Sequence, residues 1–298
     1  IDKKKIKILN QRENAHGNYL FLDLLIDKNI DPGNFTISFE NKNEKTSIQY
    51  ELKPRINSKH KMMGLDQTDF IYLIMPDRFA NGNKSNDVIK GTNQESINRD
   101  SAFYRHGGDL QGIINHVDYL SELGVSALWL NPAEENDQPL ESYHGYAITD
   151  HYTVDTRLGD NNLYKSLVTK LHENNIKIIR DVVFNHFGSE HPLIKNLPES
   201  SWINNWDNYT RSNFRATTLL DPYASEYDKM QFSNGWFDHH MPDMNYSNID
   251  LQNYMIQNSI WWIEEFDVDA YRIDTYAYSD QSFMKKWAEA IKKEYPDF

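Results

Sequence analysis

Four short, mainly apolar runs, each the length of a β-strand, constrain the fold of this chain more than any other feature. They span residues 70–75, 127–130, 176–183 and 268–273. Apolar residues fill these runs without alternating with polar ones, which is typical of parallel strands whose two faces are both covered. The sequence therefore predicts a parallel β-sheet in the larger, C-terminal part of the chain.

Segments with the helical spacing of apolar residues lie between these runs. Apolar residues recur at this spacing from Ile113 to Leu123 and stop at Gly124, a residue type that commonly ends helices. The same pattern spans residues 163–172, 251–265 and 283–291. The order is therefore four β-α units with one long insertion at about residues 187–249. Such an α/β chain is the first half of a TIM (β/α)8 barrel.

A doubly wound open sheet is the competing arrangement for repeated β-α units. Proteins of that type carry a glycine-rich, phosphate-binding turn directly after the first strand. Residues 76–82 read Pro-Asp-Arg-Phe-Ala-Asn-Gly and contain no such turn. The barrel is therefore favoured.

The first 61 residues follow a different pattern, in which apolar and polar residues alternate. Three such runs span residues 19–26, 34–39 and 47–52, and turn-forming residues separate them. This pattern predicts a small all-β sandwich domain, whose start is incomplete. Residues 57–67 read as a linker, so we place the domains at 1–61 and 62–298.

The composition argues against several classes of function. A net charge of −13 with no long basic run argues against nucleic-acid binding, because phosphate contacts need clustered Lys and Arg. No apolar stretch is long enough to span a membrane. The chain has no Cys and therefore neither disulfides nor thiolate chemistry. It begins at Ile1 without a signal segment, so we expect a processed form or a fragment.

The carboxyl end of the last apolar run carries an arginine and an aspartate, Arg272 and Asp274. Because side chains alternate along a strand, both point to the same side. Active sites of (β/α)8 barrels form where the strands end. A guanidinium there would keep a nucleophilic carboxylate ionised and oriented. In isolation, such a pair is more often a structural ion pair.

Polar and aromatic residues also lie at the ends of the second and third runs. The third run contains Asp181 and is followed by Asn185 and His186. An isolated histidine is usually structural, but directly after a strand a ligand contact is an equally good interpretation. The sequence Tyr-His-Gly-Tyr follows the second run at residues 143–146. Its glycine lets the backbone approach a ligand, and its aromatic rings offer a platform for a sugar.

Asn and Asp residues are concentrated in the loop at residues 79–87, and Gly107-Gly108-Asp109 follows. Side-chain oxygens at close spacing, together with a backbone carbonyl, suit a hard cation such as Ca2+. An Asx-rich turn without a metal is the commoner explanation of such a loop by itself.

Taken together, these segments resemble the α-amylase family of glycoside hydrolases. Residues 181–186, 241–245 and 271–274 are similar to three of its signature segments and occur in the same order. The Met-Pro-Asp start of the second segment and the Asn-rich loop resemble the neopullulanase and cyclomaltodextrinase branch. Within that branch the chain is most similar to periplasmic neopullulanases of bacterial starch-utilisation systems. The resemblance covers residues 66–298, and the first domain is similar to the N-terminal domain of the branch.

The resemblance implies a role for each matching residue in a retaining glycoside hydrolase of α-1,4-linked glucans. Asp274 would be the nucleophile, with Arg272 holding it and Asp181 behind Arg272. Tyr146 would stack beneath the sugar, and His144 and His186 would bind its hydroxyl groups. The implied ligands of a structural Ca2+ are Asn81, Asn83, Asn86, Asp87, Gly107 and Asp109.

Two positions depart from the family pattern. Members with α-amylase activity often carry Lys-His three and four residues after the nucleophile, where this chain has Ala277 and Tyr278. We assign Tyr278 to substrate binding. Which acceptor sugar the site prefers is left open by this departure. Retaining enzymes also need an acid carboxylate about 5 Å from the nucleophile. The family takes it from a Glu that ends the next strand, whereas Glu289 and Glu294 fall on the preceding helix. We therefore expect the chain as written to be a truncated, inactive form.

Two alternatives remain beside hydrolysis. The chain could be a non-catalytic α-glucan-binding module, for which a homodimer of two half-barrels would cover the exposed strand edges. The same family chemistry also allows transglycosylation, in which a sugar intercepts the intermediate. The resemblance further implies a periplasmic or secreted protein whose partner is an α-glucan oligo- or polysaccharide.

Overall fold

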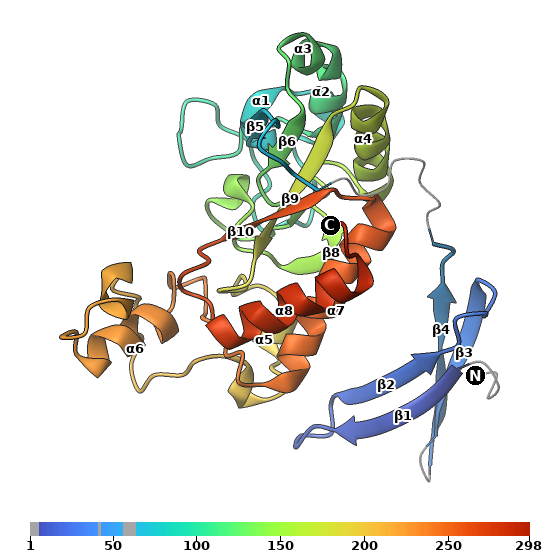
Figure 1. Cartoon of the computed structure of the whole chain (residues 1–298), viewed down its shortest axis with the longest axis vertical. Helices are drawn as coiled ribbons and strands as arrows, with labels where there is room; N and C mark the ends of the chain where they lie inside the picture. The colour runs from blue at the N-terminus through green and yellow to red at the C-terminus, as the bar shows by residue number, and fades with distance from the viewer. Residues whose placement is uncertain (1–5, 41–42, 56–63) are drawn as a thin grey trace. The chain divides into compact units, whose positions relative to one another are not determined.

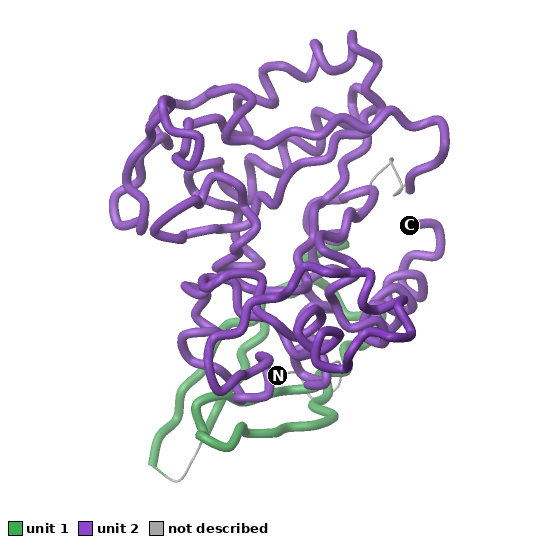
Figure 2. The backbone as a smooth tube through the Cα atoms, turned by 90° about the vertical axis from the view of Figure 1, so that its left-hand side faces the viewer, with its two compact units in different colours: residues 1–57 green, residues 58–298 purple. Residues whose placement is uncertain are grey.

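The computed structural model describes residues 6–40, 43–55 and 64–298. The chain divides into two compact units, Ile1–Asn57 and Ser58–Phe298, which Figure 2 colours green and purple. The linker expected at residues 57–67 lies largely outside the described residues.

The N-terminal unit consists of two antiparallel hairpins. Their strands are β1 (Ile6–Glu13), β2 (Leu20–Ile26), β3 (Gly33–Glu40) and β4 (Lys45–Leu52). β1 pairs with β2, and β3 pairs with β4. The expected all-β character is confirmed, but β1 was not among the predicted strands. Its register shifts between Ile8 and Asn10, and such a bulge interrupts the alternation that identifies a strand.

The C-terminal unit is built around a four-stranded parallel sheet (Figure 1). Its strands are β5 (Ile71–Ile74), β6 (Ala127–Leu130), β9 (Lys177–Val183) and β10 (Ala270–Asp274). The spatial order is β10-β9-β6-β5, so each strand pairs with the next one along the chain. A doubly wound sheet reverses direction at a switch point, and this sheet does not. The predicted first half of a (β/α)8 barrel is therefore confirmed.

The long helices follow the predicted apolar spacing. They are α4 (Asn161–Glu173), α7 (Ile249–Phe266) and α8 (Gln281–Glu294). Each begins directly after an Asp or Asn whose side chain accepts a backbone N–H of the first turn. α4 packs against β9 and α7, and α7 packs against α8. Glu289 and Glu294 lie on α8, as expected.

The single helix expected before Gly124 is wrong in detail. Two short helices, α2 (Leu110–Ile114) and α3 (Val117–Glu122), occupy the segment. The break falls at His116, whose ring lies 2.7 Å from the Gly112 carbonyl oxygen through Nδ1 and edge-on against Phe79. Gly124 has the left-handed φ of +85° that the C-cap prediction requires.

Strand β5 corrects the expectation that both faces of every strand are covered. Ile71 and Leu73 are 46% and 49% exposed, whereas Ile74 is buried. β5 is the last strand in the spatial order of the described sheet, so no neighbour pairs with its outer edge. The central strands β6 and β9 are buried almost throughout.

The remaining short elements occupy the loops between strands and helices. They are α1 (Pro76–Phe79), η1 (Lys84–Asn86), β7 (Glu134–Glu135), η2 (Ser142–His144), β8 (Asp150–Val154), α5 (Pro192–Lys195), η3 (Ser200–Trp202), η4 (Ala216–Leu219) and α6 (Glu226–Asn234). The last four lie in the predicted insertion between β9 and α7. A β-bridge between His186 and Asp243 ties the two ends of this insertion together. Among the described residues, no helix has both the length and the hydropathy to cross a membrane.

Candidate active site

The centre of the site is formed by the neighbouring strands β9 and β10. Their parallel register places Arg272 opposite Asp181 and Asp274 opposite Val183. The Arg272 Nη1 atom donates to Asp274 Oδ1 at 2.8 Å and to the two Asp181 oxygens at 2.8 and 3.0 Å. One guanidinium nitrogen therefore joins the two carboxylates, and the contact predicted from strand alternation is present.

The two carboxylates differ in their access to solvent. The Asp181 side chain is fully buried, whereas that of Asp274 remains 15% exposed. Burial raises the pKa of Asp181 to about 6, against the opposing effect of hydrogen bonds from Arg272, Trp129 and Tyr146. Asp181 thus lies behind Arg272, and Asp274 is the carboxylate that a ligand can reach.

Trp129 is a member of the site that the sequence did not single out. Its indole Nε1 donates to Asp181 Oδ2 at 2.9 Å, and the Arg272 guanidinium lies 4.8 Å from its ring centroid. Tyr146 Oη donates to the same Asp181 oxygen at 3.0 Å. The available signal was an indole in a buried strand, because a buried indole N–H needs a partner.

The segment before Tyr146 turns sharply at Gly145. This glycine has φ +84°, and a Cβ there would lie 2.3 Å from the Pro132 carbonyl oxygen, so only glycine fits. His144 Nδ1 accepts the Tyr146 backbone N–H at 2.9 Å. Burial lowers the pKa of His144 to about 4, so the ring is neutral at pH 7 and its proton lies on Nε2. His144 can therefore donate one hydrogen bond to a hydroxyl group.

The His186 side chain is buried and does not line an open cleft. It is 1% exposed, and its Nε2 lies 3.2 Å from the Tyr146 carbonyl oxygen. Its Nδ1 lies 3.2 Å from Asn185 Nδ2, and its ring stacks on Phe237 with centroids 5.0 Å apart. Burial lowers its pKa to about 3. His186 supports the backbone of Tyr146, while its contact with a sugar stays a prediction.

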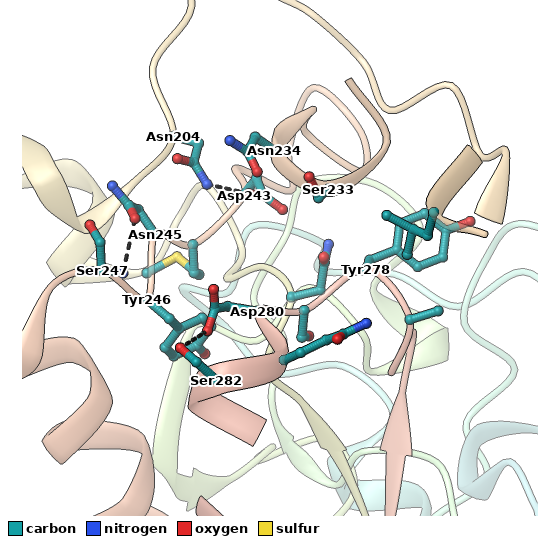
Figure 3. A pocket seen from close by; sticks show the side chains of 16 residues that line it. Asn204, Ser233, Asn234, Asp243, Asn245, Tyr246, Ser247, Tyr278, Asp280 and Ser282 are labelled. Atoms are coloured by element: carbon teal, nitrogen blue, oxygen red, sulfur yellow. Dashed lines mark hydrogen bonds between the residues drawn. The ribbon is translucent and has the colours of Figure 1, made fainter. Parts of the chain in front are cut away.

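Tyr278 lies next to this centre, among aromatic residues of the insertion. Its ring packs against Phe232 at 4.3 Å and Phe237 at 6.0 Å. Tyr278 also lines a cavity of about 390 Å3, in which Figure 3 shows Asn204 donating to Asp243. Burial raises the pKa of Asp243 well above its usual range. The cavity borders the β10–α8 loop, and Asp274 is not among its lining residues.

The backbone is strained directly after Asp274. Thr275 has φ +45°, a conformation that a β-branched residue rarely adopts. Its Oγ1 is buried without a hydrogen-bond partner. Residues held in such conformations concentrate at functional sites. No sequence pattern marks this threonine.

The six residues assigned to a calcium site come together at the loop after β5. Asn81 Oδ1 and both polar side-chain atoms of Asn86 are buried without hydrogen-bond partners. Asp87 Oδ1 accepts from Asn81 Nδ2 at 2.6 Å. A Cβ at Gly107 would lie 2.8 Å from Asp87 Oδ1, so the backbone comes close to this carboxylate. Unpaired buried oxygens beside a carboxylate are what a hard cation requires.

Asn83 and Asp109 contribute less directly to this cluster. Asn83 Oδ1 accepts from the Ser85 backbone N–H, and Asp109 accepts from the backbone of Gly82, Asn83 and Gly112. These two side chains therefore cap η1 and α2 and shape the loop. The part of the chain that the structure describes holds no group of three or more His, Cys, Asp or Glu suited to a metal. Two of the six residues assigned here, Asp87 and Asp109, are carboxylates.

Two family models match the chain, one in each of its compact units. Residues 73–296 match the alpha amylase catalytic domain. Residues 1–56 match the cyclomaltodextrinase N-terminal domain.

Known proteins are similar over about three quarters of the chain. A cyclomaltodextrinase of Thermoanaerobacter pseudethanolicus is 36% identical over 234 residues, which are 76% of this chain and 38% of that protein. An intracellular maltogenic amylase of Bacillus subtilis is 33% identical over 76% of this chain and 36% of its own length. An alpha-amylase crystal structure from Anoxybacillus has a TM-score of 0.65 at 33% identity, covering 77% of this chain and 46% of that one. The chain spans less than two fifths of the length of the two curated relatives.

Proposed function

The chain belongs to the α-amylase family of glycoside hydrolases, and we propose that the protein containing it hydrolyses α-1,4-linked glucans with retention of configuration. The observation that carries this proposal is the bridge from Arg272 Nη1 to Asp274 and Asp181 at the end of two parallel strands. A cyclomaltodextrinase and a maltogenic amylase among the relatives point to the same class of substrate.

In this mechanism Asp274 attacks the anomeric carbon and forms a glycosyl ester while the leaving oxygen is protonated. Water then cleaves the ester, so two displacements retain the configuration. Arg272 orients Asp274 through the hydrogen bond that its Nη1 atom donates to Oδ1. Tyr146 stacks beneath the sugar, and the Nε2–H of His144 donates to one of its hydroxyl groups.

Protonation of the leaving oxygen needs a second carboxylate. Within the described residues, the carboxylates that contact Arg272 are Asp274 and Asp181, and the latter is fully buried. Glu289 lies on α8 with its side chain 65% exposed and paired with Lys285. We therefore propose that these 298 residues alone release no sugar, and that a family-type Glu on the following strand supplies the acid.

The test is hydrolysis by the longer protein and by the 298-residue chain, each incubated with maltoheptaose, pullulan and cyclodextrins. We expect reducing ends from the longer protein, with products initially in the α configuration by NMR, and none from the chain alone. Release of β products, or no release from any substrate, would contradict the proposed function. Release by the 298-residue chain would contradict only its predicted inactivity.

We also propose a structural Ca2+ held by Asn81, Asn86, Asp87 and the Gly107 carbonyl, in a loop shaped by Asn83 and Asp109. The unpaired buried oxygens of Asn81 and Asn86 support it. The ion would stabilise the loop that follows β5 and would take no part in bond cleavage.

Calcium should therefore raise the melting temperature. At about 100 times its dissociation constant it should stabilise the fold by about 2.7 kcal/mol, which corresponds to a Tm increase of about 2–4 °C in a protein of this length or longer. Differential scanning calorimetry of the longer protein with EDTA and with added Ca2+ measures this change. Asn86→Ala should abolish the response. Asn93→Ala is the matched control, since Asn93 is an exposed asparagine of the next loop that pairs with Asp137. A wild-type Tm that does not respond to Ca2+ would exclude the site.

Location and assembly remain predictions. A periplasmic or secreted protein would appear in the extracellular or osmotic-shock fraction of its host, and a homodimer would sediment at twice the monomer mass.

A further inference from the structure

We propose that Trp129 is a positioning residue of this site, acting on the nucleophile through two intervening side chains. Its indole N–H fixes the carboxylate of Asp181. Asp181 in turn holds the Arg272 guanidinium that contacts Asp274. The inference rests on the proposed function, since it concerns the orientation of the proposed nucleophile.

Trp129 is well placed to act as a fixed donor. It lies in β6, which pairs with β5 on one side and β9 on the other. Its side chain packs against the buried cluster of Ala127, Ile179 and Ala270. A planar side chain with two rotatable bonds, packed in this way, presents its N–H in one direction at little further entropic cost.

The indole ring of Trp129 contacts both Asp181 and Arg272. Its Nε1 lies 2.9 Å from Asp181 Oδ2, and its face lies under the Arg272 guanidinium, 4.8 Å from the centroid. The hydrogen bond fixes the rotation of the Asp181 carboxylate. The cation–π contact fixes the distance of the Arg272 guanidinium from the indole ring. Together they determine where Nη1 lies relative to Asp274.

The other groups that face Asp181 cannot replace this donor. They are Arg272 and, behind it, Asp274 from β10, and Tyr146 from the loop after η2. Tyr146 is assigned to the bound sugar, and Arg272 is the group to be positioned. The Asp181 side chain is fully buried, so water cannot substitute. Trp129 is therefore the donor to Asp181 to which neither sugar binding nor contact with Asp274 is assigned.

Loss of the indole N–H has a consequence that depends on pH. The hydrogen bond from Trp129 opposes the rise in the pKa of Asp181 that burial causes. Without this bond the pKa of Asp181 moves further upward from about 6. A protonated Asp181 attracts Arg272 less strongly. The acid limb of the pH–rate profile, which is the range where the rate falls as the pH is lowered, therefore moves to higher pH.

The test is the pH profile of maltoheptaose hydrolysis by the longer protein carrying Trp129→Phe. One lost hydrogen bond to a charged group corresponds to an upward shift of the acid limb by about one pH unit. We expect kcat at pH 6 to fall by about fivefold, with KM within about twofold of wild type. A merely structural role would lower the amount of folded enzyme without moving the limb.

Trp262→Phe is the matched control. Like Trp129, Trp262 has a bonded indole N–H, which donates to the His151 carbonyl oxygen, and it lies under an arginine, Arg180 at 4.3 Å. Trp262 has no contact with Asp181 in the described structure. The acid limb of the Trp262→Phe variant should therefore stay at the wild-type pH.

A second variant removes only the N–H. Replacement of Trp129 by 3-benzothienyl-alanine keeps the shape and the aromatic face, with sulfur in place of the nitrogen, so folding should be preserved. The same upward shift supports the proposal, whereas a wild-type acid limb and kcat in this variant would overturn it. A wild-type protein that hydrolyses no α-glucan would instead overturn the proposed function, and this inference with it.

Discussion

Replacement of Asp274 by asparagine should lower kcat for α-glucan hydrolysis by about 10⁴-fold or more in the longer protein. Asparagine has the same shape and can still accept from Arg272 Nη1, but it cannot form the glycosyl ester. Initial rates with maltoheptaose measure the loss, and substrate binding should persist because the sugar-binding groups are unchanged.

Asp160→Asn is the matched control for this substitution. Asp160 caps α4 through the Leu163 N–H, and asparagine is an equally good N-cap. Its rate should stay within about twofold of wild type, because a substitution that preserves the cap changes stability little. An Asp274→Asn variant that kept a tenth of the wild-type kcat would exclude Asp274 as the nucleophile.

Removal of Arg272 should affect both rate and stability. Arg272→Leu leaves Asp181 buried without its cation, and loss of one partner of a buried pair costs about 3 kcal/mol. We take the lower end of the usual range because the Arg272 side chain is 32% exposed. Asp274, the proposed nucleophile, also loses its orienting donor, so kcat/KM should fall by about 10³-fold.

The double variant Asp181→Asn/Arg272→Leu separates these two effects. Asparagine removes the unpaired charge but can still accept hydrogen bonds from Trp129 and Tyr146, so Tm should recover most of its loss. The rate should not recover, since Asp274 still lacks Arg272. Recovery of rate and Tm together would show that Arg272 serves the fold alone.

Local patterns were sufficient to predict the sheet and the centre of the site. The predicted strand at 127–130 agrees residue for residue with β6, because both of its faces are buried. Arg272 and Asp274 were expected on one side of their strand, and a shared hydrogen bond joins them. The motif resemblance to the α-amylase family is also confirmed. In each case neighbours in the sequence determine the feature.

Features that depend on distant partners could not be predicted. Trp129 lies 52 positions from Asp181, and only the pairing of β6 with β9 brings the two together. The strain at Thr275 depends on the surrounding structure, because no local pattern favours φ +45°. The break at His116 likewise depends on its packing against Phe79. The roles of the individual site residues in catalysis stay predictions.

The order of the parallel sheet affects how this region can form during synthesis. After β5, each strand of the described sheet pairs with the sheet strand that precedes it along the chain. Every β-α unit can therefore dock onto its predecessor as it leaves the ribosome, without waiting for distant sequence. Such stepwise growth keeps chain-closure costs small at every stage. It also means that Asp274, on the last of these strands, is placed after Trp129 and Asp181 are already in position.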